Sequence, residues 1–571
     1  MPPPAIDSDL SYLCGQSDAP LLYLTVDRVL SDAAGRWPSR TALVVRHQGL
    51  RYTYGELAAA VERIARGLLA CGLKPGARVG IWSPNNAEWV QVMFATARAG
   101  LILVNINPAY RASELEFALR QSGCSALLLA ASFKSSDYIE MLRSMIPELK
   151  NARPGQLASA KLPRLKTLVQ LSAADVPGFL SFADLQAAGE AAGPVALARA
   201  TQSLDPDAPY NIQFTSGTTG LPKGATLTHF NLVNNGYFVG EAMRLTAADS
   251  LCIPVPMYHC FGMVLGVLAA MTHGAAAVFP SEGFEPLAVL EAVAAERCTA
   301  LHGVPTMFIA ELEHPRFAEF DLSSLRTGIM AGAPCPVSIM RRVVADMHMP
   351  EVTICYGMTE TSPVSFQSTT DDPLEKRVNS VGRVHPHVQI KIADEHGRAV
   401  PRGTPGELCT RGYSVMQGYW GEPERTREVL DAAGWMHTGD LAVVDAQGYC
   451  NIVGRIKDMI IRGGENISPR DVEEYLYRHP AVLDVAVVGV PSQRYGEEVC
   501  ACVRLKEGAR AAAEEIREFC RGQIAHYKIP RHVVFVDSFP MTVTGKVQKF
   551  IIRERMRREL GLNDGEQAGQ S

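Results

Sequence analysis

The chain has 571 residues, more than the roughly 250–300 at which a single hydrophobic core stops growing, so at least two domains are expected. Hydrophobic residues make up 47% and charged residues 20% of the chain, a balance that excludes a disordered protein. The formal net charge of −5 argues against a protein that binds nucleic acid through bulk positive charge, so no nucleic-acid partner is expected.

The cysteines and the N-terminus indicate a cytoplasmic protein. The 13 cysteines form no C-x-x-C pair, so we expect reduced thiols in the core and no zinc site. The N-terminal segment MPPPAIDSDL lacks the basic and apolar regions of a signal peptide. Residues 250–281 contain no Asp, Glu, Lys or Arg, but prolines and histidines interrupt them, and the clean apolar run is too short to span a bilayer. We therefore expect buried interior there and no integral membrane segment.

The first elements alternate between helix and strand. Apolar residues at helical spacing predict a helix that begins at Tyr54 and is stopped by Gly72. The segment KPGARVGIWSP predicts a turn and a buried strand, after which Asn85 or Asn86 is expected to cap a helix. The segment LILVNINP then predicts another strand. Because this alternation continues through much of the first 330 residues, the predicted fold class is α/β, with parallel sheets covered by helices.

Further along, the pattern changes twice. Residues 150–207 are rich in Ala, Gly and Pro, which predicts a surface excursion rather than a domain. The strongest boundary lies near residues 455–458, beyond which short strands such as VAVVGVP and VVFV interleave with amphipathic helices. We therefore predict a large N-terminal domain over residues 1–456 and a small, mobile α+β domain over residues 457–571, with a polar, disordered tail from Gly561.

A glycine-rich loop carries the strongest chemical signal. The segment TSGTTGLPKG runs from Thr215 to Gly224, directly after the apolar run YNIQF. Glycines let the backbone approach a bulky anion, while hydroxyl groups, amide hydrogens and Lys223 supply donors and positive charge. The loop is not a Walker A motif, in which the lysine would precede Ser or Thr. This composition after a strand predicts a phosphate-binding loop.

This loop and the motifs that follow it resemble the adenylate-forming superfamily of acyl- and aryl-CoA synthetases, peptide-synthetase adenylation domains and beetle luciferases. The loop matches the family's nucleotide loop without a mismatch, and the resemblance covers roughly residues 30–555. The further motifs occur in the family's order: AGAP at 331–334, YGMTE at 356–360, TGD at 438–440, GRIKDMIIRGGENI at 454–467 and PMTVTGKVQK at 540–549. The resemblance implies an enzyme that uses ATP, Mg²⁺ and coenzyme A.

The resemblance also implies a role for each matching residue. The phosphates and adenine of ATP would be bound by Thr215, Ser216, Gly217, Thr218, Thr219, Gly220, Lys223, Gly332, Ala333, Pro334, Tyr356 and Gly357. Thr359 would contact the α-phosphate and Glu360 would bind Mg²⁺. Asp440 and Arg455 would bind the ribose, and Lys546 would contact the reacting carboxylate. These assignments also make chemical sense, because joining a carboxylate to a nucleotide brings anions together, and fixed cations and donors must offset their repulsion.

The resemblance implies two half-reactions in one site. The carboxylate would attack the α-phosphorus of ATP, and the CoA thiol would then attack the carbonyl of the acyl-adenylate. The small domain would rotate about Lys457 between these steps, so that Lys546 serves the first step only. Gly463 and Gly464 would then line the channel for the pantetheine arm of CoA.

The expected substrate is a carboxylic acid, with a medium- or long-chain fatty acid as the leading choice. His259 lies in the segment PMYHCFG, where acyl-CoA synthetases often carry a histidine beside the acyl pocket. No acidic partner for a substrate amine is visible there, which argues against an amino acid. Small residues at near-helical spacing after His259 are compatible either with an acyl channel or with tight helix packing.

Alternatives from other classes stay open. The main variant is an aryl acid–CoA ligase, and the rival activity is an adenylating enzyme that loads a carrier protein in trans. An inactive, non-catalytic relative is disfavoured, because the motif residues are all intact: Lys223, Thr359, Glu360, Asp440, Arg455 and Lys546. The basic segment IIRERMRREL is interrupted by glutamates, so a solvated helix is favoured over transient membrane contact. The oligomeric state is not indicated by the sequence.

Overall fold

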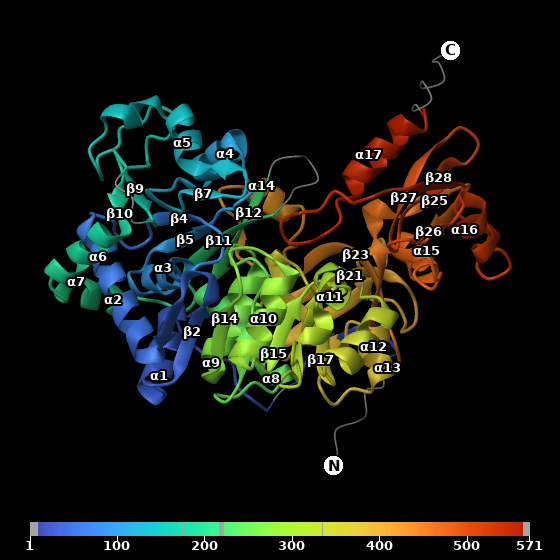
Figure 1. Ribbon diagram of the computed structural model, residues 1–571, viewed down its shortest axis with the longest axis horizontal. Helices are drawn as coiled ribbons and strands as arrows, with labels where there is room; N and C mark the ends of the chain where they lie inside the picture. Colours follow the sequence, from blue (N-terminus) through green and yellow to red (C-terminus); the bar gives the residue numbers. More distant parts are fainter. Residues whose placement is uncertain (1–8, 17, 173–175, 216–221, 334, 563–571) are drawn as a thin grey trace.

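The computed structural model describes residues 9–16, 18–172, 176–215, 222–333 and 335–562. Strands and helices alternate along most of the first 330 residues, as predicted (Figure 1). Parallel strands need a crossover connection, usually a helix, so this alternation places helices on the faces of parallel sheets. The α/β fold class is therefore confirmed.

One large sheet has the strand order β19-β18-β17-β16-β15-β13-β14-β2-β3. Its central strands, from β2 to β17, are parallel to their neighbours, whereas β3, β18 and β19 pair antiparallel at the edges. The strands are β2 (Thr41–Val45), β3 (Leu50–Thr53), β13 (Ser250–Cys252), β14 (Ala276–Phe279), β15 (Ala300–Gly303), β16 (Thr327–Ala331), β17 (Glu351–Gly357), β18 (Val364–Gln367) and β19 (Arg383–Val384).

A second large sheet has the order β10-β9-β6-β4-β5-β11-β12-β22, parallel from β10 to β11 and antiparallel beyond. Its strands are β4 (Arg78–Trp82), β5 (Ile102–Asn105), β6 (Ala126–Leu129), β9 (Thr167–Gln170), β10 (Leu180–Ser181), β11 (Pro209–Thr215), β12 (Lys223–Thr228) and β22 (Gly418–Tyr419). A short hairpin, β7 (Ser132–Phe133) with β8 (Ser136–Asp137), stands beside it.

Helices pack between and around these sheets, and one apolar cluster joins strands of both sheets through α1, α2, α3, α8 and α9. The helices of the large domain are α1 (Val26–Arg36), α2 (Tyr54–Ala70), α3 (Ala87–Arg98), α4 (Ala112–Ser122), α5 (Tyr138–Met145), α6 (Phe182–Ala191), α7 (Val195–Gln202), α8 (His229–Ala242), the π-helix η3 (Phe261–Leu268), α9 (Ala269–His273), α10 (Pro286–Glu296), α11 (Pro305–Leu312), α12 (Val337–Asp346), α13 (Leu374–Asn379) and α14 (Pro423–Arg427).

The first predicted helix boundaries are confirmed. Helix α2 begins at Tyr54, because the Thr53 side chain accepts a hydrogen bond from the Glu56 amide and the Glu56 carboxylate accepts one from the Thr53 amide. The chain leaves this helix at Gly72, whose φ of +84° suits glycine. Asn86, not Asn85, caps α3 by accepting a hydrogen bond from the Trp89 amide.

The prediction of a surface excursion over residues 150–207 is wrong for part of that segment. Strand β9 pairs with β6 and β10 inside the second large sheet, and all of its residues are buried. A four-residue strand that is buried on both faces shows no alternation of apolar and polar residues. Its flanks are irregular, so nothing in the local pattern marked TLVQ as sheet.

An antiparallel sheet that the predicted fold class did not include completes the large domain. Its order is β1-β20-β21-β23-β24, and β20 shows the alternating burial of a strand with one face packed. The strands are β1 (Tyr12–Cys14), β20 (Val388–Ala393), β21 (Gly406–Gly412), β23 (Met436–Val444) and β24 (Cys450–Arg455).

The chain then passes through a short 3₁₀ turn, η6 (Ile456–Asp458), into a smaller α+β unit, drawn orange to red in Figure 1. This is where the boundary is predicted. Its sheet has the order β26-β25-β28-β27, with β29 added beside β28. Its elements are β25 (Ile460–Arg462), β26 (Glu465–Ile467), α15 (Pro469–Leu476), β27 (Val482–Ser492), β28 (Gly496–Leu505), α16 (Ala513–Cys520), β29 (His532–Phe535) and α17 (Lys549–Glu559).

The uncharged segment 250–281 lies mostly in the interior, as predicted. Its central part, η3 and the first residues of α9, is completely buried in the cluster that joins the two large sheets. Among the described residues, no helix is both long enough and apolar enough to cross a membrane.

Candidate active site

The ends of β11 and β12 bring Thr215 opposite Lys223, so the predicted phosphate loop connects two paired strands. Ser216, Gly217, Thr218, Thr219 and Gly220 lie outside the described residues, as does Pro334. Pairing of Thr215 with Lys223 fixes both ends of the loop.

Glu360, the predicted metal ligand, lies in the 3₁₀ turn η5 (Thr359–Thr361) and is only 5% exposed. Its Oε1 accepts hydrogen bonds from Tyr419 Oη at 2.9 Å and from Thr215 Oγ1 at 3.4 Å. The Nζ atom of Lys223 lies 4.9 Å from the centre of the Tyr419 ring. The phosphate loop and the acidic turn therefore share one cluster.

Tyr419 is a member of this cluster that the sequence analysis did not identify. It belongs to β22, which pairs with β12 so that Tyr419 stands opposite Ala225, two residues from Lys223. Nearly 200 residues separate Tyr419 from Lys223 in the chain. A Gly-Tyr pair of that kind gives no local signal of a site, so only the sheet pairing reveals it.

The predicted nucleotide residues Tyr356, Asp440 and Arg455 also meet, although they come from different sheets. Tyr356 Oη donates a hydrogen bond of 2.5 Å to Asp440 Oδ2, and Arg455 Nε lies 3.1 Å from Asp440 Oδ1. Asp440 and Arg455 are directly paired on β23 and β24. Burial, reinforced by the Asp440 carboxylate, raises the pKa of the Tyr356 phenol well above its usual value.

Two predicted nucleotide glycines occupy positions that a side chain would not fit well. Gly332 follows β16 with φ +91°, beside the half-buried Ala333. A Cβ atom on Gly357 would lie 1.7 Å from the carbonyl oxygen of Pro363. Gly357 is therefore required for close backbone packing, and this contact accounts for glycine there without a ligand.

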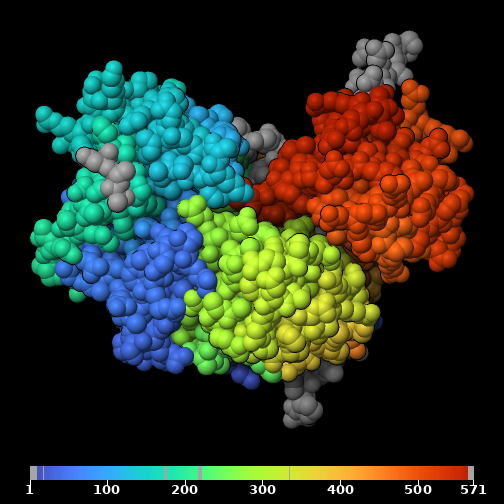
Figure 2. All heavy atoms as spheres, in the orientation of Figure 1, coloured from blue at the N-terminus to red at the C-terminus, as the bar shows by residue number. Residues whose placement is uncertain are grey.

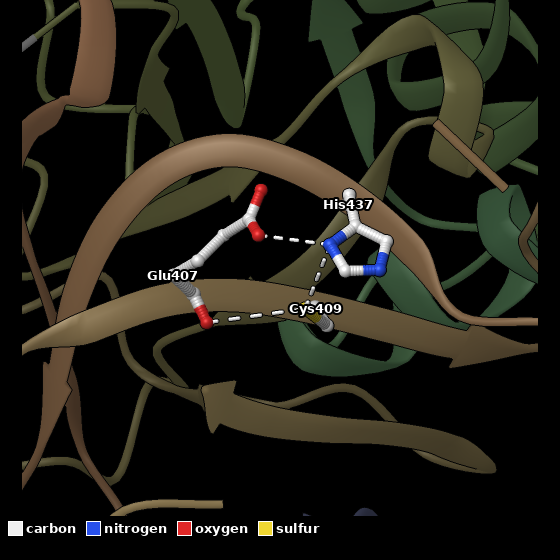
Figure 3. Close-up of side chains that lie close together, drawn as sticks. All are labelled: Glu407, Cys409 and His437. Atoms are coloured by element: carbon white, nitrogen blue, oxygen red, sulfur yellow. Dashed lines mark hydrogen bonds and ion pairs between the residues drawn. The ribbon is translucent and has the colours of Figure 1, made fainter. Parts of the chain in front are cut away.

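A side-chain cluster supports the turn that carries Asp440 (Figure 3). Glu407 accepts hydrogen bonds from the Gly439 amide at 3.1 Å and from His437 Nδ1 at 2.8 Å. Cys409 Sγ lies 3.6 Å from the same nitrogen, and burial raises the pKa of its thiol to about 12. These atoms are close enough to hold a metal ion. Because Glu407 is already engaged by Gly439 and His437, we interpret the cluster as a support for the Asp440 turn.

Lys546 lies in the small domain, in the hairpin-like turn that the sequence predicts and that an antiparallel bridge between Met541 and Val547 closes. The hairpin is closed by hydrogen bonds from the Thr542 amide to the Lys546 carbonyl at 2.8 Å and from the Lys546 amide to Thr542 Oγ1 at 3.0 Å. Burial is the main cause that lowers the pKa of its ammonium group, and Arg455 adds to it, while Asp440 and Glu360 oppose it. The lysine thus lies in the electrostatic field of both predicted acidic residues.

His259 lies beside Thr359, linked to it through Cys260. Its Nδ1 accepts a hydrogen bond from the Phe261 amide at 3.1 Å, and Cys260 Sγ lies 3.9 Å from Thr359 Oγ1. Burial, reinforced by the Lys546 charge, lowers the pKa of His259 to about 3. The imidazole is therefore neutral, and because Nδ1 accepts, its proton is on Nε2.

The small residues after His259 serve close packing. The segment forms the π-helix η3, in which a Cβ on Gly262 would lie 2.5 Å from the Pro256 carbonyl oxygen and one on Gly266 would lie 3.0 Å from Ile253. These glycines let η3 pack against the segment before it. Of the two interpretations left open, the contacts of both glycines favour packing over an acyl channel.

A cavity of about 270 Å³ lies beside Tyr258, between the large domain and the Lys546 hairpin. The residues that line it from the two domains include Tyr258, Thr306, Met307, Thr542, Val543 and Gly545.

The residues predicted for the second half-reaction are not gathered with the others. Lys457 is exposed in η6, between β24 and β25. Gly463 and Gly464 form the exposed turn between β25 and β26, with φ of +59° and +89°. The structure thus places Lys546 beside Gly332, where a Cβ would lie 3.4 Å from Lys546 Cε, and leaves the glycine turn at the surface.

The chain is similar to known proteins over most of its length. The model of the AMP-binding enzyme family matches residues 30–420, and that of the AMP-binding enzyme C-terminal domain matches residues 471–546. YngI of Bacillus subtilis (strain 168), which is named as an acyl-CoA synthetase, is 47% identical over 549 residues, covering 96% of this chain and 100% of YngI.

The mitochondrial medium-chain acyl-CoA ligase ACSF2 of Bos taurus is also 47% identical, over 97% of this chain and 91% of that protein. Among solved structures, the anthranilate CoA ligase AuaEII in complex with anthranoyl-AMP superimposes with a TM-score of 0.84 at 26% identity, covering 95% of this chain and 99% of AuaEII.

Proposed function

The chain belongs to the AMP-binding enzyme family, and on that basis we propose that it is a medium-chain acyl-CoA ligase that works through an acyl-adenylate. Its similarity to acyl-CoA ligases extends over nearly the whole chain and makes it an AMP-forming ligase of thioester bonds. The observation that carries the mechanism is the position of Lys546, which comes from the small domain and lies beside Gly332 of the large domain, where a Cβ would be 3.4 Å from Lys546 Cε.

In the first half-reaction, the carboxylate of the acid attacks the α-phosphorus of ATP and pyrophosphate leaves. We assign Lys223 and Thr215 to the phosphates that leave, and Tyr356, Asp440 and Arg455 to the nucleoside. We assign Lys546 to the two anions that must meet, because its positive charge would offset their repulsion in a partly buried site where water screens little.

His259 is proposed to orient the acid. Because its proton is on Nε2, the neutral imidazole donates a hydrogen bond without adding charge. Neutrality suits a site in which Lys546 already supplies the cation. Thr359, joined to His259 through Cys260, is proposed to bind the α-phosphate.

Glu360 fits the ligand chemistry of Mg²⁺. Its carboxylate is buried, and Tyr419 and Thr215 hold Oε1 on the side of the phosphate loop. Mg²⁺ prefers hard oxygen ligands and is usually held by one or two carboxylates together with substrate phosphates. When bound there, the ion neutralises phosphate charge during the displacement.

In the second half-reaction, the CoA thiol attacks the adenylate carbonyl and AMP leaves. The Lys546 hairpin forms part of the wall of the cavity beside Tyr258, so we propose that its departure opens this cavity to the pantetheine arm. Rotation about Lys457 would bring Gly463 and Gly464 towards it. A Cβ on Gly464 would meet no atom within 4 Å, whereas one on Gly463 would lie 3.2 Å from Cδ1 of Tyr495.

The medium chain length rests on the likeness to ACSF2, and the fold likeness to AuaEII keeps an aryl acid as the second candidate. We further propose action in the cytoplasm, which the reduced core thiols support. The ACSF2 relatives are named as mitochondrial, so their similarity to this chain supports the proposed activity but not the proposed location.

The test is pyrophosphate release and CoA-thioester formation with acetate, octanoate, palmitate and benzoate. We expect Mg·ATP-dependent thioester formation that is fastest with octanoate. A preference for benzoate would establish the aryl alternative instead. Pyrophosphate release without any thioester would indicate a carrier-protein acceptor, and inactivity with every acid would contradict the proposal.

A further inference from the structure

The hairpin that carries Lys546 rests on the start of α11 in the large domain. Thr306 Oγ1 donates a hydrogen bond of 3.3 Å to the carbonyl oxygen of Gly545. Gly545 has φ +76°, and a Cβ atom there would lie only 2.8 Å from Val304 Cγ2. The backbone of the turn therefore touches the large domain directly, at a distance that only glycine allows. Figure 2 shows the red segment lying against the green surface at this junction.

One of these large-domain residues, Val304, also lies next to Gly332, which is assigned to the nucleotide. A Cβ on Gly332 would lie 3.1 Å from Val304 Cγ1 and 3.4 Å from Cε of Lys546. Val304 thus lies against the turn through Cγ2 and beside Gly332 through Cγ1, and the end of the Lys546 side chain lies beside the same glycine. It is the N-cap of α11, followed by Pro305 in the first turn. Proline fixes its own φ and restricts the residue before it, so this contact surface is rigid.

We propose that Val304 and Thr306 form a docking seat for the Gly545 turn, which positions Lys546 for acyl-adenylate formation and releases it for thioester formation. Thr306 is a positioning residue in this scheme, since it acts on Lys546 through the Gly545 carbonyl group. The inference rests on the proposed function, in which one site serves two half-reactions.

A single neutral hydrogen bond suits such a seat. The small domain must occupy two positions, and a contact made in only one of them shifts the population by its own free energy. A neutral hydrogen bond shifts an equilibrium by about threefold to tenfold, which biases the domain without locking it. A buried ion pair at this place would oppose the departure that the second half-reaction requires.

The first test separates the half-reactions in Thr306→Val, which keeps the shape and loses the donor. We expect acid-dependent ATP–pyrophosphate exchange to fall about threefold to tenfold through kcat, with the KM for ATP unchanged. CoA-thioester formation from supplied acyl-adenylate should stay at the wild-type rate. Thr306→Ser keeps the donor and should restore the exchange. An equal fall in both half-reactions, or no fall in either, would overturn the inference.

A second pair of variants tests the close approach of the turn. Gly545→Ala should reduce ATP–pyrophosphate exchange more than Thr306→Val does. The new methyl group would clash with Val304, and alanine would also be strained at this positive φ. Gly522→Ala is the matched control, since Gly522 has a similar φ of +69° and a Cβ there meets no atom within 4 Å. If both alanine variants lose ATP–pyrophosphate exchange equally, the effect comes from backbone strain and the docking seat is refuted.

Hydrogen exchange of the free protein provides a readout that needs no substrate. The segment 540–548 should exchange faster in Thr306→Val than in the wild type, while the rest of the small domain is unchanged. Unchanged exchange in this segment would refute the seat. If the wild type activates no acid, the proposed function fails on that result, and the hydrogen-exchange comparison still decides whether the seat exists.

Discussion

Tyr356 donates a hydrogen bond of 2.5 Å to Asp440, and this contact joins β17 of a parallel sheet to β23 of the antiparallel sheet. The nucleotide pocket proposed here is thus built across two sheets, with 83 residues between the partners in the chain. Arg455 approaches the same carboxylate from β24. A pocket of this kind depends on the packing of the sheets as much as on its own residues.

We expect Tyr356→Phe to raise the KM for ATP about tenfold, because the Asp440 carboxylate loses a charged-acceptor hydrogen bond while the ring stays able to stack. Steady-state kinetics at varied ATP would measure it. The control is Tyr449→Phe, which removes a similar 2.6 Å bond to Asp372 outside the pocket and should leave the KM for ATP unchanged. Equal shifts in both variants would show that the Tyr356 bond has no special role in the pocket.

We expect Lys546→Ala to lower the adenylation rate on the order of 10²-fold or more, because a preorganised charge is lost where anions meet. Thioester formation from supplied acyl-adenylate should be spared. Lys528→Ala removes a small-domain lysine that pairs with Asp471 at the surface and should change neither step. Equal loss of both half-reactions in Lys546→Ala would contradict a role limited to the first.

Tyr419→Phe should raise the Mg²⁺ concentration needed for half-maximal adenylation about threefold to tenfold, because Oε1 of Glu360 loses the donor that orients it. Titration of the pyrophosphate-exchange rate with Mg²⁺ would measure this shift. At saturating Mg²⁺ the variant should approach the wild-type rate. A loss that excess Mg²⁺ does not relieve would mean that Tyr419 acts elsewhere.

The pH profile of adenylation should contain no step from His259. Burial and the nearby Lys546 charge hold its pKa at about 3, so the imidazole is neutral throughout pH 5–9. On the alkaline side, Lys546 is active when protonated, and burial lowers its pKa. Activity should therefore fall as the pH rises, beginning below the pKa of an ordinary lysine, ~10.4. The pH dependence of kcat/KM checks this, and Lys546→Arg should remove the alkaline fall.

Gly357→Ala should destabilise the large domain by about 3 kcal/mol or more, since the methyl group would have to displace the backbone at Pro363. Gly49→Ala is the control. Gly49 has φ +65° with no atom within 4 Å of a Cβ, so only a backbone cost of about 1–2 kcal/mol is expected there. Denaturant unfolding of both variants measures the difference, and similar losses would argue against the steric account.

Elements whose signals are local could be predicted from the amino-acid pattern. The helix from Tyr54 to Gly72 follows from apolar spacing and a glycine stop, and the strand-helix alternation follows from the period of the hydrophobic pattern. The glycine-rich loop and the Lys546 turn can be recognised from the sequence because the characteristic residues of each are consecutive in the chain. Short motifs of this kind need no knowledge of the fold.

Contacts between residues that are distant in the chain depend on the tertiary fold. The local sequence does not indicate strand β9, because a strand buried on both faces shows no alternation of apolar and polar residues. Tyr419 reaches Glu360 only because β22 pairs with β12. The seat of Gly545 on Val304 and Thr306 depends on how one domain rests on another. Such contacts arise from packing between surfaces that are separate in the chain, and the free energy that selects them belongs to the whole arrangement rather than to any single segment.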